Sequence, residues 1–199
     1  MEAARRAGKG ILFIGGHFAN WELFEVALAG LGLEGAKVLQ HPSNPFVLAS
    51  IARHRYAYGL DEQIATGEGV FVRVRDALRS GRAVQMLADQ RTSKGAKVPF
   101  FGVATTTNLV PARAARETGA HVILMAMRRV GPARFAIEFS PPRSYGPGDD
   151  EIAIMGEVNG FYEEQLRRTP AHWLWGHPRW GDVFEGIPAQ PLVTPPPGG

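Results

Sequence analysis

Short apolar runs alternate with segments of helical periodicity along most of this chain. Two runs, Ile11–Ile14 and Ala83–Ala88, are almost continuously apolar, which is typical of strands buried in a parallel sheet. Lys37–Gln40 predicts a further short strand. Residues 121–127 and 134–139 predict a pair of strands joined by a turn.

Apolar residues at helical spacing predict helices between these strands. The first begins at Asn20, as a capping residue, and ends near Leu31. Further helices are expected at residues 46–57, 70–80, 108–118 (capped by Asn108) and 151–168. This alternation indicates an α/β fold with a mixed, mostly parallel central sheet flanked by helices. We expect one domain over residues 1–185 and a disordered Pro- and Gly-rich tail over residues 186–199.

The most informative polar residues stand directly after the first strand. Gly15 and Gly16 allow a sharp turn, and His17 and Glu22 follow. Ligands of open α/β sheets bind beyond the carboxyl ends of strands. There, an imidazole can take a hydroxyl proton while a carboxylate keeps the other ring nitrogen protonated. The alternative is that His17 and Glu22 form an ordinary pair on the protein surface with no catalytic role. Asp89 also follows a strand, so we expect it at the same edge.

Composition excludes several classes of chemistry. The chain has no cysteine, which excludes disulfides, thiolate catalysis and Cys-ligated zinc. Its histidines lack metal-ligand spacing, so we expect no metal. No apolar run reaches the roughly 18 residues that span a bilayer. No G-x-G-x-x-G follows the first strand, which argues against dinucleotide binding. The formal net charge of +3 fits an anionic partner such as a phospholipid or a phosphorylated sugar.

Four blocks, in order, resemble one family. His17-Phe18-Ala19-Asn20-Trp21-Glu22 matches the HX4(D/E) motif of glycerolipid-type acyltransferases. The other blocks are His41 to Pro45, Asp89-Gln90 with Val98 to Thr107, and Pro170 to Trp180. Over roughly residues 10–182 the chain therefore resembles the lipid A biosynthesis late acyltransferases, the lauroyl and myristoyl acyltransferases.

The resemblance implies an O-acyltransferase with no cofactor. It would move a fatty acyl chain from acyl carrier protein, or acyl-CoA, to a hydroxyl of a lipid A precursor. His17 is then the general base and Glu22 its orienting partner. Backbone amides at Gly15 and Gly16, or the Asn20 side chain, would stabilise the oxyanion.

The resemblance also implies a set of substrate-binding residues. Arg53 and Arg55 follow the second block, and their guanidinium groups suit a phosphorylated sugar. A solvated helix face explains two arginines equally well. Asp89, Gln90 and Arg91 are assigned to the acceptor or donor site, and the alternative is that these three residues are only a polar loop after a buried strand. Residues 91–97 are expected to form a polar, charged loop.

The expected partners are acyl carrier protein, a glycolipid and a membrane surface, with no nucleic acid. The resemblance implies a peripheral location at the cytoplasmic face of the bacterial inner membrane. Members of the family usually carry a longer amino-terminal part with a membrane-anchoring helix, and we expect that part to be missing here. Trp173, Trp175 and Trp180 fit core packing or an interfacial anchor. His177 is expected to be structural or peripheral, with a second catalytic base as the alternative.

Two other functions remain open from the sequence. One is acylation of a different glycolipid, such as a phosphatidylinositol mannoside, by enzymes that share the motif and often lack a membrane helix. The other is a truncated, non-catalytic lipid-binding module. Acyl transfer that depends on His17 would distinguish an enzyme from a binding module.

Overall fold

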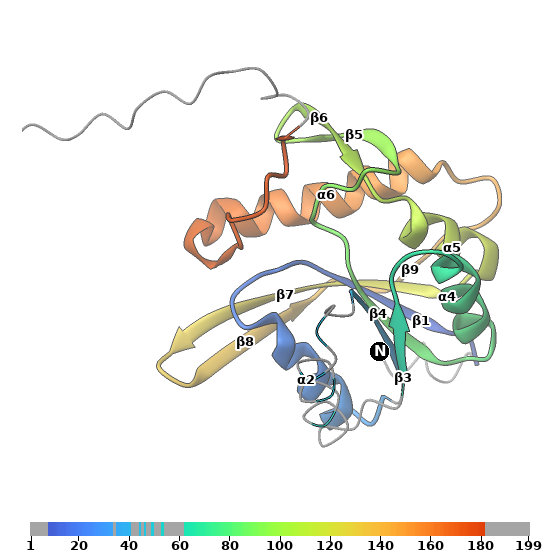
Figure 1. Ribbon diagram of the computed structural model, residues 1–199, viewed down its shortest axis with the longest axis horizontal. Coiled ribbons are helices and arrows are strands. Elements are labelled where there is room, and N and C mark those ends of the chain that lie inside the picture. The colour runs from blue at the N-terminus through green and yellow to red at the C-terminus, as the bar shows by residue number, and fades with distance from the viewer. Residues whose placement is uncertain are drawn as a thin grey trace, which may run out of the picture.

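The computed structural model describes residues 8–33, 35–40 and 62–181, together with the single residues 44, 46, 49 and 53. Within this part, seven strands form one twisted sheet in the order β3-β2-β4-β1-β7-β8, and β9 pairs with β7 (Figure 1). The strands are β1 Ile11–Gly15, β2 Gly35–Leu39, β3 Glu62–Ala65, β4 Ala83–Leu87, β7 His121–Gly131, β8 Arg134–Phe139 and β9 Arg143–Ser144. All are parallel except β8 and β9, which confirms the mixed, mostly parallel sheet.

Helices cover both faces of this sheet (Figure 1). Their bounds are η1 Trp21–Leu23, α2 Phe24–Gly30, α4 Val70–Arg79, α5 Val110–Thr118, α6 Glu151–Arg168 and η2 Pro170–His172. On one face α2 packs on alternate strand residues such as Phe13 and Met125. On the other face α4, α5 and α6 bury residues such as Leu12 and Ile14. Strands β1 and β7 are thus covered on both sides, which explains their nearly continuous apolar sequences.

A second sheet lies outside α6. Its two antiparallel strands are β5 Ala96–Phe100 and β6 Val103–Thr107, joined by a tight turn in which Phe101 and Gly102 have φ of 51° and 76°. The sequence analysis missed these strands and placed a loop over residues 91–97. At this turn Phe100 is buried and Phe101 is exposed.

The first helix differs from its prediction at the start. Asn20 makes no side-chain cap, and a 3-10 turn precedes α2. Asn108 lies one residue before the N-cap position, Leu109, and its Oδ1 accepts a hydrogen bond of 2.9 Å from the amide of Val110, the first residue of α5. The strands at residues 11–14 and 83–88 and the helices at 70–80, 108–118 and 151–168 are confirmed within one or two residues.

Some predictions fall outside the described part. These are most of the helix at residues 46–57, the block from His41 to Pro45 apart from Asn44, and the tail at residues 186–199. Among the helices that the structure does describe, none has the length and apolarity needed to cross a bilayer.

Candidate active site

The site forms where two neighbouring parallel strands end. Gly15 of β1 pairs with Leu87 of β4, and the chain continues for two residues in each case, to His17 and to Asp89. The Ala88 amide extends the ladder by bonding the Gly15 carbonyl at 3.1 Å. Both segments continue for two residues past the same paired position, so the side chains of His17 and Asp89 meet. The sequence analysis expected this for the carboxyl edge of the sheet.

The turn that presents His17 requires glycine at position 16. A Cβ atom there would lie 2.6 Å from the Phe18 ring and 3.2 Å from Cγ of Asp89. The turn is also held by the carboxyl-terminal segment, because the Leu174 amide donates to the His17 carbonyl at 3.0 Å and the Ala19 amide donates to the His172 carbonyl at 2.6 Å. Residues far apart in sequence thus fix the position of the imidazole.

Asp89 holds His17 through both its backbone and its ring. Oδ2 of Asp89 accepts the His17 backbone amide at 2.9 Å and the Trp173 indole N–H at 2.7 Å. Oδ1 lies 2.7 Å from Nδ1 of His17. The carboxylate is 1% exposed and has three donors around it. Burial by itself raises the pKa of Asp89, but the hydrogen bonds and charge of His17, with the Trp173 bond, lower that pKa below its ordinary 3.8.

The ionised carboxylate determines which ring nitrogen carries the proton. An acceptor at Nδ1 keeps that nitrogen protonated, so Nε2 of the neutral ring is left as a proton acceptor. The Gln90 side-chain amide lies 3.4 Å from Nε2, a long contact that a substrate hydroxyl can replace. The Trp21 ring packs edge-on against the imidazole, with 5.1 Å between centroids. Nε2 is therefore the ring nitrogen that is left as a hydrogen-bond acceptor.

Glu22 lies in the 3-10 turn η1 and contacts strand β2. Its carboxylate binds Nζ of Lys37 at 3.1 Å, and the same ammonium pairs with Glu25 of α2. The cause is local: the 3-10 turn at residues 21–23 places Trp21 against the ring and directs Glu22 toward β2. Asp89 is the acid on the imidazole in the structure, and the orienting role of Glu22 stays a prediction.

The other predicted residues are only partly brought together. Gln90 lies at Nε2 of His17. Asn20 is exposed at the turn before η1, and Arg53 is exposed. Arg91 packs beside Gly181 of the carboxyl-terminal segment. Arg55 lies outside the described residues, and none of the substrate-binding roles is tested by these positions.

Two residues that contact the site were not assigned to it from the sequence. Trp173 was assigned to packing or anchoring, yet its indole donates a hydrogen bond to the Asp89 carboxylate. Tyr162 of α6 is fully buried, and its hydroxyl donates to the Gly15 carbonyl at 2.6 Å, at the end of β1. Burial raises the pKa of Tyr162 well above 10, and the Asp89 charge adds to this, so the phenol stays a donor. A tryptophan and a tyrosine in apolar surroundings gave no signal beyond core packing.

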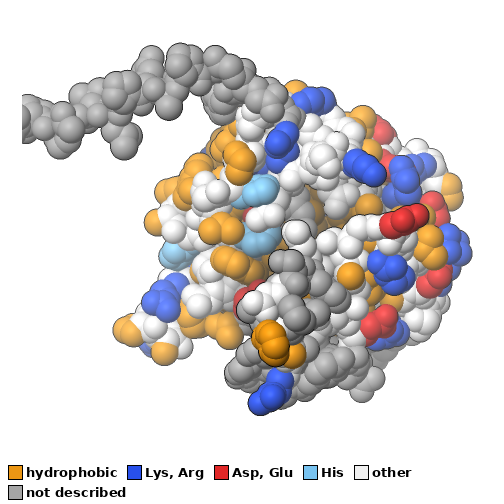
Figure 2. Space-filling model, viewed as in Figure 1, with side chains coloured by type: hydrophobic (Ala, Val, Ile, Leu, Met, Phe, Trp, Pro, Cys, Tyr) orange, Lys and Arg blue, Asp and Glu red, His pale blue; other side chains and the backbone are white. Residues whose placement is uncertain are grey.

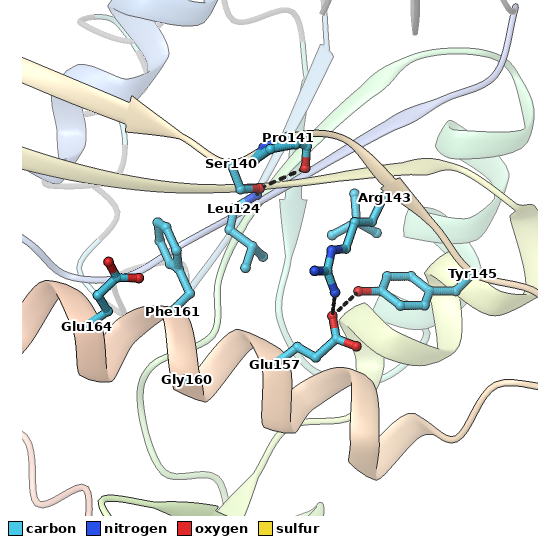
Figure 3. A pocket seen from close by; sticks show the side chains of 10 residues that line it. Leu124, Ser140, Pro141, Arg143, Tyr145, Glu157, Gly160, Phe161 and Glu164 are labelled. Carbon is cyan, nitrogen blue, oxygen red and sulfur yellow. Dashed lines mark hydrogen bonds and ion pairs between the residues drawn. The ribbon is translucent and has the colours of Figure 1, made fainter.

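A separate cavity of about 340 Å³ lies between α6 and the β7–β9 region (Figure 3). Leu124 and Phe161 line its apolar part, and Arg143 and Tyr145 both bond the Glu157 carboxylate at its other end. Burial, with Glu157, raises the pKa of Tyr145 to about 12. No predicted site residue lines this cavity, so it stands apart from the His17 site.

Fold and site together define an α/β protein with a buried aspartate and a histidine at the carboxyl edge of its sheet. The chain belongs to the bacterial lipid A biosynthesis acyltransferase family, whose sequence model matches residues 1–182. This confirms the resemblance drawn from the four sequence blocks.

Two similar proteins are phosphatidylinositol mannoside acyltransferases of Mycobacterium tuberculosis, from strains ATCC 25618 / H37Rv and CDC 1551 / Oshkosh. Each is 25% identical over 194 residues, covering 96% of this chain and 61% of the relative. The chain thus spans about three fifths of the length of the curated relatives it matches.

Proposed function

We propose that this protein is an O-acyltransferase of glycolipid synthesis in which His17 is the general base and Asp89 positions it. The observation that carries the proposal is the bond from Nδ1 of His17 to the buried Asp89 carboxylate, which leaves Nε2 as the acceptor. Membership of the acyltransferase family supports the reaction class.

The reaction uses a thioester donor and an alcohol acceptor. The acceptor hydroxyl attacks the thioester carbonyl carbon while Nε2 of His17 takes the hydroxyl proton. The tetrahedral intermediate then collapses, the carbon–sulfur bond breaks, and the imidazolium returns the proton to the leaving thiolate. Asp89 stabilises the imidazolium between these steps. No covalent acyl-enzyme is required.

Hydrogen-bond donors near the β1 turn are proposed to stabilise the oxyanion of the tetrahedral intermediate. We assign this role to the Asn20 side chain, which is exposed there, or to the Gly16 backbone amide. The next three amides of the turn already donate within the protein, to Asp89, Gly16 and His172. Gln90 is the substrate-contact residue best placed beside Nε2. Asp89 is buried and surrounded by its own donors, so its role is positioning rather than substrate contact. Arg53, Arg55 and Arg91 are proposed for the phosphate groups of the substrates.

The proposed donor is acyl carrier protein or acyl-CoA, and the proposed acceptor is a lipid A precursor, in line with the family. A second acceptor, phosphatidylinositol mannoside, is favoured by the names of the two similar proteins. Either acceptor is a membrane lipid, so the proposed location is the inner membrane surface on the cytoplasmic side.

Radiolabelled acyl transfer tests this proposal. Both donors are offered with detergent-dispersed lipid A precursor or phosphatidylinositol mannoside, and the labelled glycolipid is separated and counted. His17→Ala is expected to lower transfer by at least about 10²-fold, the scale of general base catalysis. His177→Ala is the matched control, because that imidazole belongs to no contact of the site, and it is expected to keep normal transfer.

Two results would contradict the proposal. If acyl transfer survives in His17→Ala, His17 is not the general base. If the protein binds lipid but transfers no acyl chain, it is a non-catalytic binding module. The acceptor that is labelled decides between the two glycolipid classes.

A further inference from the structure

The β7–β8 hairpin extends beyond the rest of the sheet. Pairing between β7 and β1 stops at Met125, opposite Gly15, but β7 continues for six residues to Gly131. At about 3.3 Å per residue this is roughly 20 Å of additional strand, paired only with β8. Because β7 runs parallel to β1, the hairpin projects from the same edge of the sheet as His17 (Figure 1).

The tip of this hairpin combines three positive charges with an exposed aliphatic side chain. We call Arg128, Arg129 and Arg134 the hairpin-tip arginines, and Val130 between them is 50% exposed. Figure 2 shows basic and hydrophobic side chains together at this projecting end, at the lower left. The whole chain has an excess of only three positive charges, so such a local concentration is distinctive.

The hairpin-tip arginines lack acidic partners in the described part of the chain. No carboxylate there lies within ion-pair distance of any of them, although most other arginines of α4, α5 and α6 pair with an acid. Arg129 only packs over the Phe135 ring, at 5.3 Å. Their charges are therefore available to an external anion.

An exposed valine among unpaired arginines fits a phospholipid surface better than a small anion. Guanidinium groups bind phosphates in the headgroup layer, while an aliphatic side chain at the tip enters the boundary with the acyl chains. A second exposed apolar surface lies beside His17. It consists of Leu174 and Trp175, which are 38% and 56% exposed. These residues directly follow Trp173, which pairs with Phe18 of the β1 turn. Tryptophan favours the headgroup zone.

We propose that the β7–β8 hairpin tip docks on the anionic phospholipid surface of a membrane and orients the His17 edge of the sheet toward it. The inference rests on the proposed function for its purpose, since a glycolipid acceptor lies in that surface. Its measurement does not depend on catalysis.

Vesicle partitioning of the full chain tests the docking. Binding is measured by flotation with vesicles of phosphatidylcholine alone and of phosphatidylcholine mixed with phosphatidylglycerol. Each basic residue near an anionic membrane raises partitioning roughly fivefold, so changing all hairpin-tip arginines to Gln is expected to lower it roughly a hundredfold. Added salt is expected to weaken wild-type binding, because it screens these charges.

A matched variant removes the same charge from the other end of the molecule, on α4 and α5 (Figure 1). It carries Arg75→Gln, Arg79→Gln and Arg113→Gln. This control is expected to bind the anionic vesicles within about threefold of wild type, because charges more than a Debye length from the surface are screened. If both variants lose vesicle binding equally, the net charge of the protein explains the binding, and the proposal is overturned.

A label at the tip tests contact directly, because the chain has no cysteine of its own. Val130→Cys carrying an environment-sensitive dye is expected to brighten and shift to the blue on anionic vesicles. Ile152→Cys, 43% exposed at the start of α6, is expected to stay unchanged. No change at position 130 would overturn insertion of the tip.

The remaining outcomes separate this inference from the proposed function. Vesicle binding that survives loss of the hairpin-tip arginines overturns the docking whatever the enzyme does. Loss of acyl carrier protein binding with vesicle binding intact would make the tip a protein-docking site instead. Failure of the proposed function appears differently, as absence of transfer to a detergent-dispersed acceptor by the wild-type chain.

Discussion

Replacing Asp89 by Asn tests the central contact of the site with almost no change of shape. The amide oxygen can take the place of Oδ2 and accept from the His17 backbone and the Trp173 indole, which lie 2.9 and 2.7 Å away. The NH₂ group then takes the place of Oδ1, 2.7 Å from Nδ1 of His17. A donor at this point requires Nδ1 to be the unprotonated nitrogen, so the proton moves to Nε2.

This reversed tautomer cannot accept the proton of a substrate hydroxyl. The same change in a histidine–aspartate pair lowers kcat by about 10⁴-fold, so we expect a loss of that order. KM is expected to change little, because Asp89 is 1% exposed and its proposed role is to position His17. Folding should weaken by about 2 kcal/mol, since three hydrogen bonds lose a charged acceptor.

The assay is steady-state acyl transfer with denaturant unfolding of the same samples, and imidazole nitrogen chemical shifts report the tautomer. Glu22→Gln is the matched control, because it neutralises the neighbouring acid, which binds Lys37 instead of the ring. We expect it to keep kcat within about tenfold. Equal losses for both variants, or near-normal kcat in Asp89→Asn, would refute the reasoning, and the former would restore the orienting role of Glu22.

Three further outcomes follow from the same contacts. Lys37→Met should lower the free energy of unfolding by about 3 kcal/mol in denaturant titration, because it leaves the Glu25 carboxylate buried without this ammonium; an unchanged midpoint would contradict this. Trp173→Phe should cost about 2 kcal/mol of stability and lower transfer, since Asp89 loses its indole donor, whereas Trp175→Phe loses only an exposed bond to a backbone carbonyl and should stay near wild type. Because the folded-state pKa of Asp89 lies below 3.8, its stabilisation is complete above that pH and is lost as the pH falls through the folded-state pKa. The stability difference between wild type and Asp89→Asn should therefore shrink in acid, and a difference that grows below about pH 4 would show the opposite shift.

The fold was predictable where burial alone sets the residue pattern. Strands β1 and β4 are covered on both faces, so their sequences are apolar runs, and α4, α5 and α6 show helical spacing. Strands β5 and β6 were missed although every second residue is buried, as at Val98, Phe100, Thr105 and Thr107. The sequence analysis did not use this alternation. A sheet that packs on α6 with one face tolerates polar residues on the other.

The position of His17 at the end of a strand was predictable, but the acid that contacts its ring was not. His17 and Glu22 are close in sequence, which favoured their pairing, whereas Asp89 is 72 residues from His17. Their contact requires that β1 and β4 be neighbours in register, a property of strand order. The Trp173 bond requires in addition that the chain return to the same edge after α6.

The sequence by itself determined the α/β class, the family and the histidine at a strand end, because apolar periodicity, glycine turns and ordered motif blocks are local properties of the chain. Only the tertiary structure decided which acid holds the imidazole and which residues support that acid. It also decided that three arginines meet at a projecting hairpin with no acidic partner among the residues that the structure describes. Those facts depend on which segments lie next to one another in space. The order of strands in a sheet is fixed by the packing of the whole domain and not by any local stretch of sequence.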